Sequence, residues 1–327
     1  MLNYLIKRVL AAIPLLFIIS IIVFSIIHLT PGDPAIYILG ADAPEDDLQR
    51  LRIQLGLDDP LIQQYFAWLI GILQGDFGIS IYENLPVTEV IMNRVQPTLS
   101  LTIMAILISI VIAIPLGVVA AVKQGTFLDT TIISLALIGI STPTFLIGIF
   151  LMILFGVHLG WLPVSGYRPL SEGIVAHIRY LILPAFTLGL LQAALIMRMA
   201  RSSMLDVLQS NFIKAAKSRG IKPMSLLILH AFRNALLPII TVVGMSIVTL
   251  FGGAVITESL FNIPGVGQMT VNSVLRRDYS VIQGTILFVG FIYILINLVI
   301  DILYTIIDPR VQLTAGTKFS FKKERST

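Results

Sequence analysis

Residues 211–238, NFIKAAKSRGIKPMSLLILHAFRNALLP, form a charged segment with good helix propensity between two long apolar runs. Asn211 has a side chain that is favoured at a helix N-cap, which predicts a short helix over residues 212–219. Gly220 then suits the left-handed residue that ends many helices. The segment therefore predicts a two-turn helix that is distinct from the apolar runs on either side.

One face of this short helix carries very little side-chain volume. Ala216 and Gly220 are four residues apart, and residues at that spacing lie on the same face of a helix. Such a face permits close approach of another protein's backbone. Pro223 can occupy the first turn of the next helix. We interpret the segment as a docking element, and the alternative is a plain amphipathic loop between membrane helices.

The composition indicates a polytopic, all-α membrane protein. Hydrophobic residues make up 56% of the 327 residues and charged residues 12%, and the mean hydropathy is +0.93. Soluble domains are about 45–50% apolar and about 25% charged. The apolar runs follow one another so closely that a single helical membrane domain is expected. The absence of cysteine from the sequence excludes disulfides, thiolate metal sites and cysteine nucleophiles.

The first apolar run covers residues 9–27 and follows Lys7 and Arg8. A bilayer requires about 20 apolar residues, and no small-residue cleavage site precedes Pro31. We therefore predict an uncleaved first span within residues 1–30, with its N-terminus inside, rather than a signal peptide.

Residues 31–97 contain ten acidic residues against three arginines, which favours an extracytoplasmic region. Within this region, Asp59-Pro60 precedes an expected helix over residues 61–73. That helix is short and contains Gln63 and Gln64, so we expect it to lie on the membrane surface rather than to cross it.

Five further spans are expected at about residues 99–122, 131–156, 179–198, 234–257 and 281–307. Six spans place both termini inside, and residues 311–327 become a cytoplasmic tail behind a five-helix core at 98–310. The inside segments hold fifteen Lys and Arg and the outside segments seven, as the positive-inside rule requires. The loop at 198–233 holds seven of the fifteen and a single acid, so it is expected in the cytoplasm.

Few ionisable residues lie at membrane depth. Arg198, Glu258 and Asp301 are close to expected span ends, which favours helix-end anchors or interhelical pairs over a proton relay. Gly252 and Gly253 lie near the outer end of the fifth span, where a helix that lines a pathway benefits from a surface without side chains; simple packing is the alternative. The four histidines show no metal-ligand spacing, so no metal site is expected.

Several nucleotide and hydrolase motifs are absent from the sequence. It contains no GxxxxGK[ST] phosphate loop, no HExxH and no GxSxG. If the protein uses ATP, another chain must bind it.

The central segment resembles the cytoplasmic loop signature of ATP-binding-cassette importer permeases. The pattern is Lys214-Ala215-Ala216, three residues, Gly220, then a histidine, an asparagine and a proline at positions 230, 234 and 238. The family's usual glutamate is replaced by Lys214. The phrases HLTPGDPA, ESLFNIPGVGQ and IDPRV extend the resemblance over nearly the whole chain, which is similar to the "B-type" permeases of dipeptide, oligopeptide, nickel or glutathione importers.

The resemblance implies a type I importer fold in a bacterial or archaeal cytoplasmic membrane. It implies a heterodimer with a second homologous permease, two cytoplasmic ATPase subunits that hold ATP and Mg²⁺, and an extracytoplasmic substrate-binding protein. No cofactor is expected in this chain. Membrane lipid is an expected partner, and nucleic acid is not. The residues expected to couple the chain to an ATPase are Phe212, Lys214, Ala215, Ala216 and Gly220.

The outer loop between the fifth and sixth spans contains Phe261-Asn262-Ile263-Pro264-Gly265-Val266-Gly267. Pro264 and Gly265 suit a tight turn in which the glycine takes a positive φ, and Gly267 removes another side chain. The turn would place Phe261 and Val266 at the outer mouth. We hypothesise that the loop is part of an external gate that meets the matching loop of a partner permease; an ordinary loop on the lipid headgroups is the alternative.

The expected function is a permease subunit that moves a small peptide-like solute inward by alternating access, driven by ATP hydrolysis on partner subunits. The alternative is a secondary transporter driven by an ion gradient, which predicts a carboxylate at mid-depth and paired broken helices. A membrane-embedded enzyme is a third possibility, for which the sequence shows no catalytic constellation.

Overall fold

The computed structural model describes residues 2–29, 36, 40, 43–54 and 56–307. Within these ranges the regular elements are helices, and one isolated bridge joins Ile79 to Pro86. The all-α prediction is confirmed. The expected tail at residues 311–327 lies outside the described residues.

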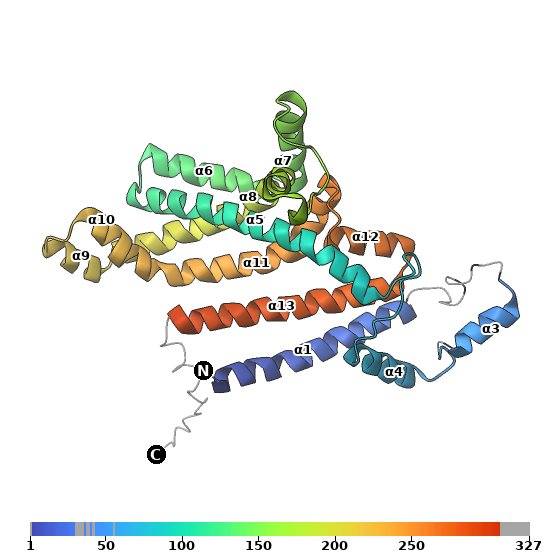
Figure 1. Ribbon diagram of the computed structural model, residues 1–327. Coiled ribbons are helices and arrows are strands. Elements are labelled where there is room, and N and C mark those ends of the chain that lie inside the picture. The colour runs from blue at the N-terminus through green and yellow to red at the C-terminus, as the bar shows by residue number, and fades with distance from the viewer. Residues whose placement is uncertain (1, 30–35, 37–39, 41–42, 55, 308–327) are drawn as a thin grey trace, which may run out of the picture.

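Helix α1 (Leu2–Leu29) lies alongside α13 (Tyr279–Ile307), so the first and last described helices of the chain are neighbours (Figure 1). Arg8 donates to the Asp301 carboxylate across this pair. The Gln283 side chain also donates to the Val23 carbonyl oxygen, at 3.3 Å. Of the two roles expected for Asp301, helix-end anchor or interhelical pair, the structure shows the interhelical pair.

Helices α5 (Val87–Val122) and α8 (Ile174–Leu208) form the centre of the bundle. They approach closely because small residues lie at the crossing points: a Cβ added at Gly117 would lie 2.7 Å from the Ala200 Cβ, and one at Gly189 would lie 2.7 Å from the Ala105 carbonyl oxygen. Close backbone approach through small residues is the usual packing mode of membrane helices, because lipid supplies no hydrophobic drive between them.

The span expected at residues 131–156 is not one continuous helix. Helix α6 (Phe127–Ser141) ends before Pro143. Helix α7 (Thr144–Leu151) and the π-helical turn η1 (Met152–His158) follow as one segment, which is bent by 103° from α6. Pro143 explains the break, because proline disfavours a helical conformation for the residue before it and has no N–H to donate.

Helix α11 (Arg233–Phe261) packs on α8 and α5, and a short helix α12 (Val266–Arg276) follows it. The 3-10 turn η2 (Leu170–Glu172) precedes α8. Helices α3 (Glu45–Gln54) and α4 (Leu61–Leu73) lie at the same end of the bundle as α12 (Figure 1). The bounds of α4 match the helix expected at 61–73.

Four helices among the described residues are long and apolar enough to cross a membrane: Val87–Val122, Ile174–Leu208, Pro223–Phe261 and Tyr279–Ile302. The bent pair of α6 with α7 and η1 would be a fifth span, and Leu10–Ile26 of α1 is a shorter apolar helix. The six-span count and the sidedness of the termini remain predictions.

Candidate functional site

The short helix expected after α8 is α9 (Asn211–Ser218), at the end of the bundle opposite α12 (Figure 1). Its N-cap is Ser210, not Asn211: the Ser210 hydroxyl accepts from the Ile213 backbone N–H at 3.4 Å. Serine is as good an N-cap as asparagine, and it lies one residue earlier. Gly220 has φ +75°, as its position after the helix predicts.

Helix α9 is held against the rest of the chain by one apolar face. Ile213 and Ala216 are buried, and the Phe212 ring contacts the His230 ring edge-on at a centroid separation of 6.0 Å. His230 belongs to the π-helical segment η3 (Leu226–Phe232), which follows the single turn α10 (Pro223–Ser225). The structure thus brings together the two halves of the central signature.

The outward face of α9 and the turn after it differ from the sequence prediction in one respect. Ala216 points inward, so it gives no clearance for another protein. Phe212 is 53% exposed, and Lys214, Ala215 and Gly220 are exposed as well. A Cβ added at Gly220 would meet nothing within 4 Å. The surface available for docking therefore consists of Phe212, Lys214, Ala215 and Gly220.

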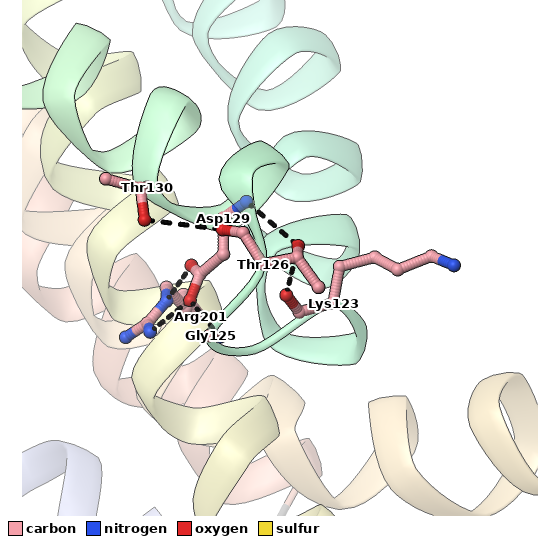
Figure 2. Close-up of polar contacts among 6 residues, drawn as sticks. All are labelled: Lys123, Gly125, Thr126, Asp129, Thr130 and Arg201. Carbon is pink, nitrogen blue, oxygen red and sulfur yellow. Dashed lines mark hydrogen bonds and ion pairs between the residues drawn. The ribbon is translucent and has the colours of Figure 1, made fainter.

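An ion pair that the sequence did not predict joins α6 to α8. The Asp129 carboxylate accepts from Arg201 Nε at 2.7 Å and from Arg201 Nη2 at 2.8 Å, and the Gly125 N–H donates to it at 3.0 Å (Figure 2). Thr126 caps α6 by accepting from the Asp129 backbone N–H at 3.5 Å. Asp129 is 5% exposed. This network ties the α5–α6 turn to α8, about ten residues before α9 begins.

At the other end of the bundle, the connection between α11 and α12 corrects two expectations. Gly265 has φ −98°, and the left-handed residue is Asn262, with φ +51°. Asparagine tolerates this conformation better than most residues. Phe261 and Val266 are 1% and 2% exposed, so both pack inside this chain rather than at a mouth, and Pro264 is partly exposed.

Glu258 organises this corner. It is fully buried, and its carboxylate accepts from Thr98 Oγ1 at 2.6 Å and from the Gln268 backbone N–H at 2.9 Å. The Val266 N–H in turn donates to Thr98 Oγ1 at 2.8 Å. A carboxylate at the N-terminus of α12 satisfies N–H groups that have no partner within the helix and complements its dipole. Glu258 thus joins α11, α5 and α12, as expected of an interhelical anchor.

The absence of side chains at Gly265 and Gly267 makes this corner possible. A Cβ at Gly265 would overlap the Glu258 carboxylate, and one at Gly267 would lie 2.8 Å from the Val255 Cα. Glycine is required at both positions because neighbouring atoms leave no room for a side chain, not because of the backbone conformation.

A cavity of about 650 Å³ lies between α6, α8 and α11. On α11 its lining residues Val242, Met245, Ser246 and Thr249 follow the spacing of a single helix face. Gly252 and Gly253 continue that face, and a Cβ at either would meet nothing within 4 Å. This face of α11 therefore carries mixed polar and apolar side chains in one half and none in the other. Among the described residues, no group of three or more His, Asp or Glu could hold a metal ion.

Comparison with known proteins agrees with this architecture. Residues 113–313 match the family described as the binding-protein-dependent transport system inner membrane component, and residues 1–102 match its N-terminal region. A Brucella abortus chain named as a peptide transport system permease protein is 44% identical over 306 residues, which cover 94% of this chain and 98% of that one. The glutathione transport system permease protein of Escherichia coli strain K12 is 40% identical over 312 residues, covering 95% and 99%.

Among solved structures, an inward-facing conformation of the MetNI methionine ABC transporter shares the fold. Its TM-score is 0.56 at 19% identity, over 68% of this chain and 97% of that one. The chain belongs to the binding-protein-dependent transport system permeases, and it is an ABC importer permease of the peptide family. It is accordingly a multi-pass protein of the cytoplasmic membrane.

Proposed function

We propose that this chain is one of two homologous permeases in an importer that carries short peptides or a related small solute, powered by two ATPase subunits. The relatives named for peptide and glutathione transport support the substrate class. An extracytoplasmic binding protein would deliver the solute to the α12 end. The chain itself would bind neither ATP nor Mg²⁺.

The observation that carries the proposal is the geometry of α9. Ile213 and Ala216 are buried against the rest of the chain, whereas Phe212, Lys214, Ala215 and Gly220 are exposed. The basic residues of this segment favour a cytoplasmic location by the positive-inside rule, which supports the proposal. We infer that this face enters a groove on an ATPase subunit, so that movement of the ATPases is transferred to α8 and α11.

A secondary transporter is less well supported. It would need a carboxylate that is free to take up and release an ion at membrane depth. Asp129 and Asp301 are paired with arginines, and Glu258 is hydrogen-bonded to Thr98 and to the α12 backbone. Each of these carboxylates thus has a structural role.

The role of α9 is tested by Gly220→Leu in the reconstituted importer. A leucine at φ +75° is strained by about 1–2 kcal/mol, and its side chain would also overfill a tight interface. We expect peptide-stimulated ATPase activity to collapse while membrane insertion persists.

The matched control is Gly160→Leu. Gly160 also has a positive φ, +63°, and a Cβ there also meets nothing within 4 Å, but it lies after η1, far along the chain from α9. This variant carries the backbone strain without the docking clash. Unchanged stimulation in Gly220→Leu, or an equal loss in both variants, would refute docking through α9.

A further inference from the structure

Two polar side chains of low overall exposure line the cavity between α6, α8 and α11. Gln192 of α8 and Ser246 of α11 are each 3% exposed and line the cavity, and neither forms a hydrogen bond with any residue that the structure describes. Buried polar side chains are normally satisfied, as Ser109 and Thr187 are by backbone carbonyl oxygens. The fully buried side-chain polar atoms without a partner in the described part of the chain belong to Thr102 and Tyr167, so the polar atoms of Gln192 and Ser246 are accessible from the cavity. Their donors and acceptors are free to bond to water or to a polar ligand there.

The charge of the cavity defines which ligand it favours. Arg198 and Arg201 line it, and no acidic residue is among the described residues that do. Arg201 is neutralised by Asp129, whereas Arg198 is exposed and forms no ion pair within the described part of the chain. One uncompensated guanidinium therefore remains, and guanidinium groups bind carboxylates by paired hydrogen bonds.

The spacing of these groups sets the size of the ligand. Gln192 and Arg198 are six residues apart on α8, a rise of about 9 Å along the helix. An extended chain covers about 3.3–3.6 Å per residue, so this separation corresponds to two or three residues of a peptide.

We propose that this cavity is a transient subsite for a short peptide on its way through the importer. Arg198 binds the C-terminal carboxylate, and Gln192 and Ser246 bond to the peptide's amide groups. The partner permease would close the side of the cavity that this chain leaves open. This inference rests on the proposed function. It adds that the permease itself recognises the C-terminal carboxylate of the peptide.

The test uses the natural absence of cysteine from this chain. In the assembled importer, with cysteines of the partner subunits replaced and without the binding protein, Thr249→Cys, at an exposed position on the cavity lining, is labelled by a hydrophilic thiol reagent. The probes are trialanine and trialanine C-terminal amide. We expect trialanine to slow labelling and the amide to do so much less. Met245→Cys, which is also exposed on the cavity, is a second reporter if Thr249→Cys impairs assembly.

Arg198→Gln should raise, by about tenfold or more, the trialanine concentration that gives half-maximal protection from labelling. This is the usual effect of losing a hydrogen bond to a charged group. The control is Arg50→Gln, in which the replaced side chain lies on α3 and is 78% exposed; protection should be retained.

Two results would overturn the subsite: equal protection by both probes, or full protection in Arg198→Gln. ATP-dependent uptake of trialanine, measured in parallel with the binding protein present, separates the two proposals. Uptake without protection refutes the subsite alone, whereas no ATP-dependent uptake of any peptide refutes the proposed function.

Discussion

Glycine is required at position 265 for a reason other than the one that its sequence context predicts. Its place after proline favoured a turn glycine with positive φ, yet its φ is −98°. The position excludes a side chain because the buried Glu258 carboxylate occupies the space where a Cβ would lie. The relevant partner is seven residues away along the chain, beyond the reach of turn rules.

A first prediction at the residue scale is that Gly265→Ala destabilises the protein. A methyl group at this position must displace a carboxylate that is held by Thr98 and Gln268, and overpacking of this kind costs about 1–3 kcal/mol. We expect a lower thermal unfolding midpoint for the purified importer. In the control Gly139→Ala, the new Cβ meets only Ala194, at 3.8 Å, and the midpoint should stay the same. Equal midpoints for the two variants would contradict the packing explanation.

At the element scale, the Asp129–Arg201 pair fixes the start of α6 to α8. The bidentate geometry and the 5% exposure of Asp129 indicate that each charge depends on the other. Gly117 packs beside the pair, since a Cβ there would lie 3.2 Å from the Arg201 backbone nitrogen. Helices α5, α6 and α8 are thus joined at the point from which α8 leads into α9.

We predict that Arg201→Met destabilises the importer more than the double variant Asp129→Asn with Arg201→Met. The single change leaves a buried carboxylate without its main partner, at a cost of about 1–3 kcal/mol, and the double change removes that charge. Thermal midpoints of both variants measure the difference. If the double variant is less stable than Arg201→Met, the unpaired Asp129 carboxylate is not the cause of the destabilisation.

The elements show how far the sequence alone could lead. Local signals predicted α4 and placed α9 within one residue of its observed bounds, because proline, glycine and capping residues act on their immediate neighbours. The break at Pro143 was also readable locally, but the apolar run across it hid the bend. Asp129 and Arg201 are 72 residues apart, and no pattern in a single sequence connects them. The burial of Ala216 depends on how α9 packs against the rest of the chain, which sequence periodicity does not describe.

At the scale of the whole molecule, the two ends of the bundle have different compositions. Helix α9, with the basic loop around it, lies at one end, and α12 with the acidic region before α5 lies at the other (Figure 1). Successive long helices would cross a membrane in alternating directions, in the order α5, α6, α8, α11 and α13. The proposed six-span topology requires α1 to cross as well and its start to lie on the α9 side.

Cysteine labelling of intact cells can decide this topology. We predict that a membrane-impermeant maleimide added outside labels Ser171→Cys and Leu275→Cys but not Gln124→Cys or Asn3→Cys, and that all four react after permeabilisation. Ser171, Leu275 and Gln124 are exposed, so their reactivity depends on the side of the membrane rather than on burial. Val266→Cys, at a position 2% exposed, should stay unreactive in both conditions and serves as the burial control. Labelling of Asn3→Cys from outside, with Gln124→Cys still protected, would mean that α1 does not cross and that the chain has five spans. Labelling of Gln124→Cys from outside would invert the core and remove α9 from the cytoplasm, and with it the proposed contact with the ATPases.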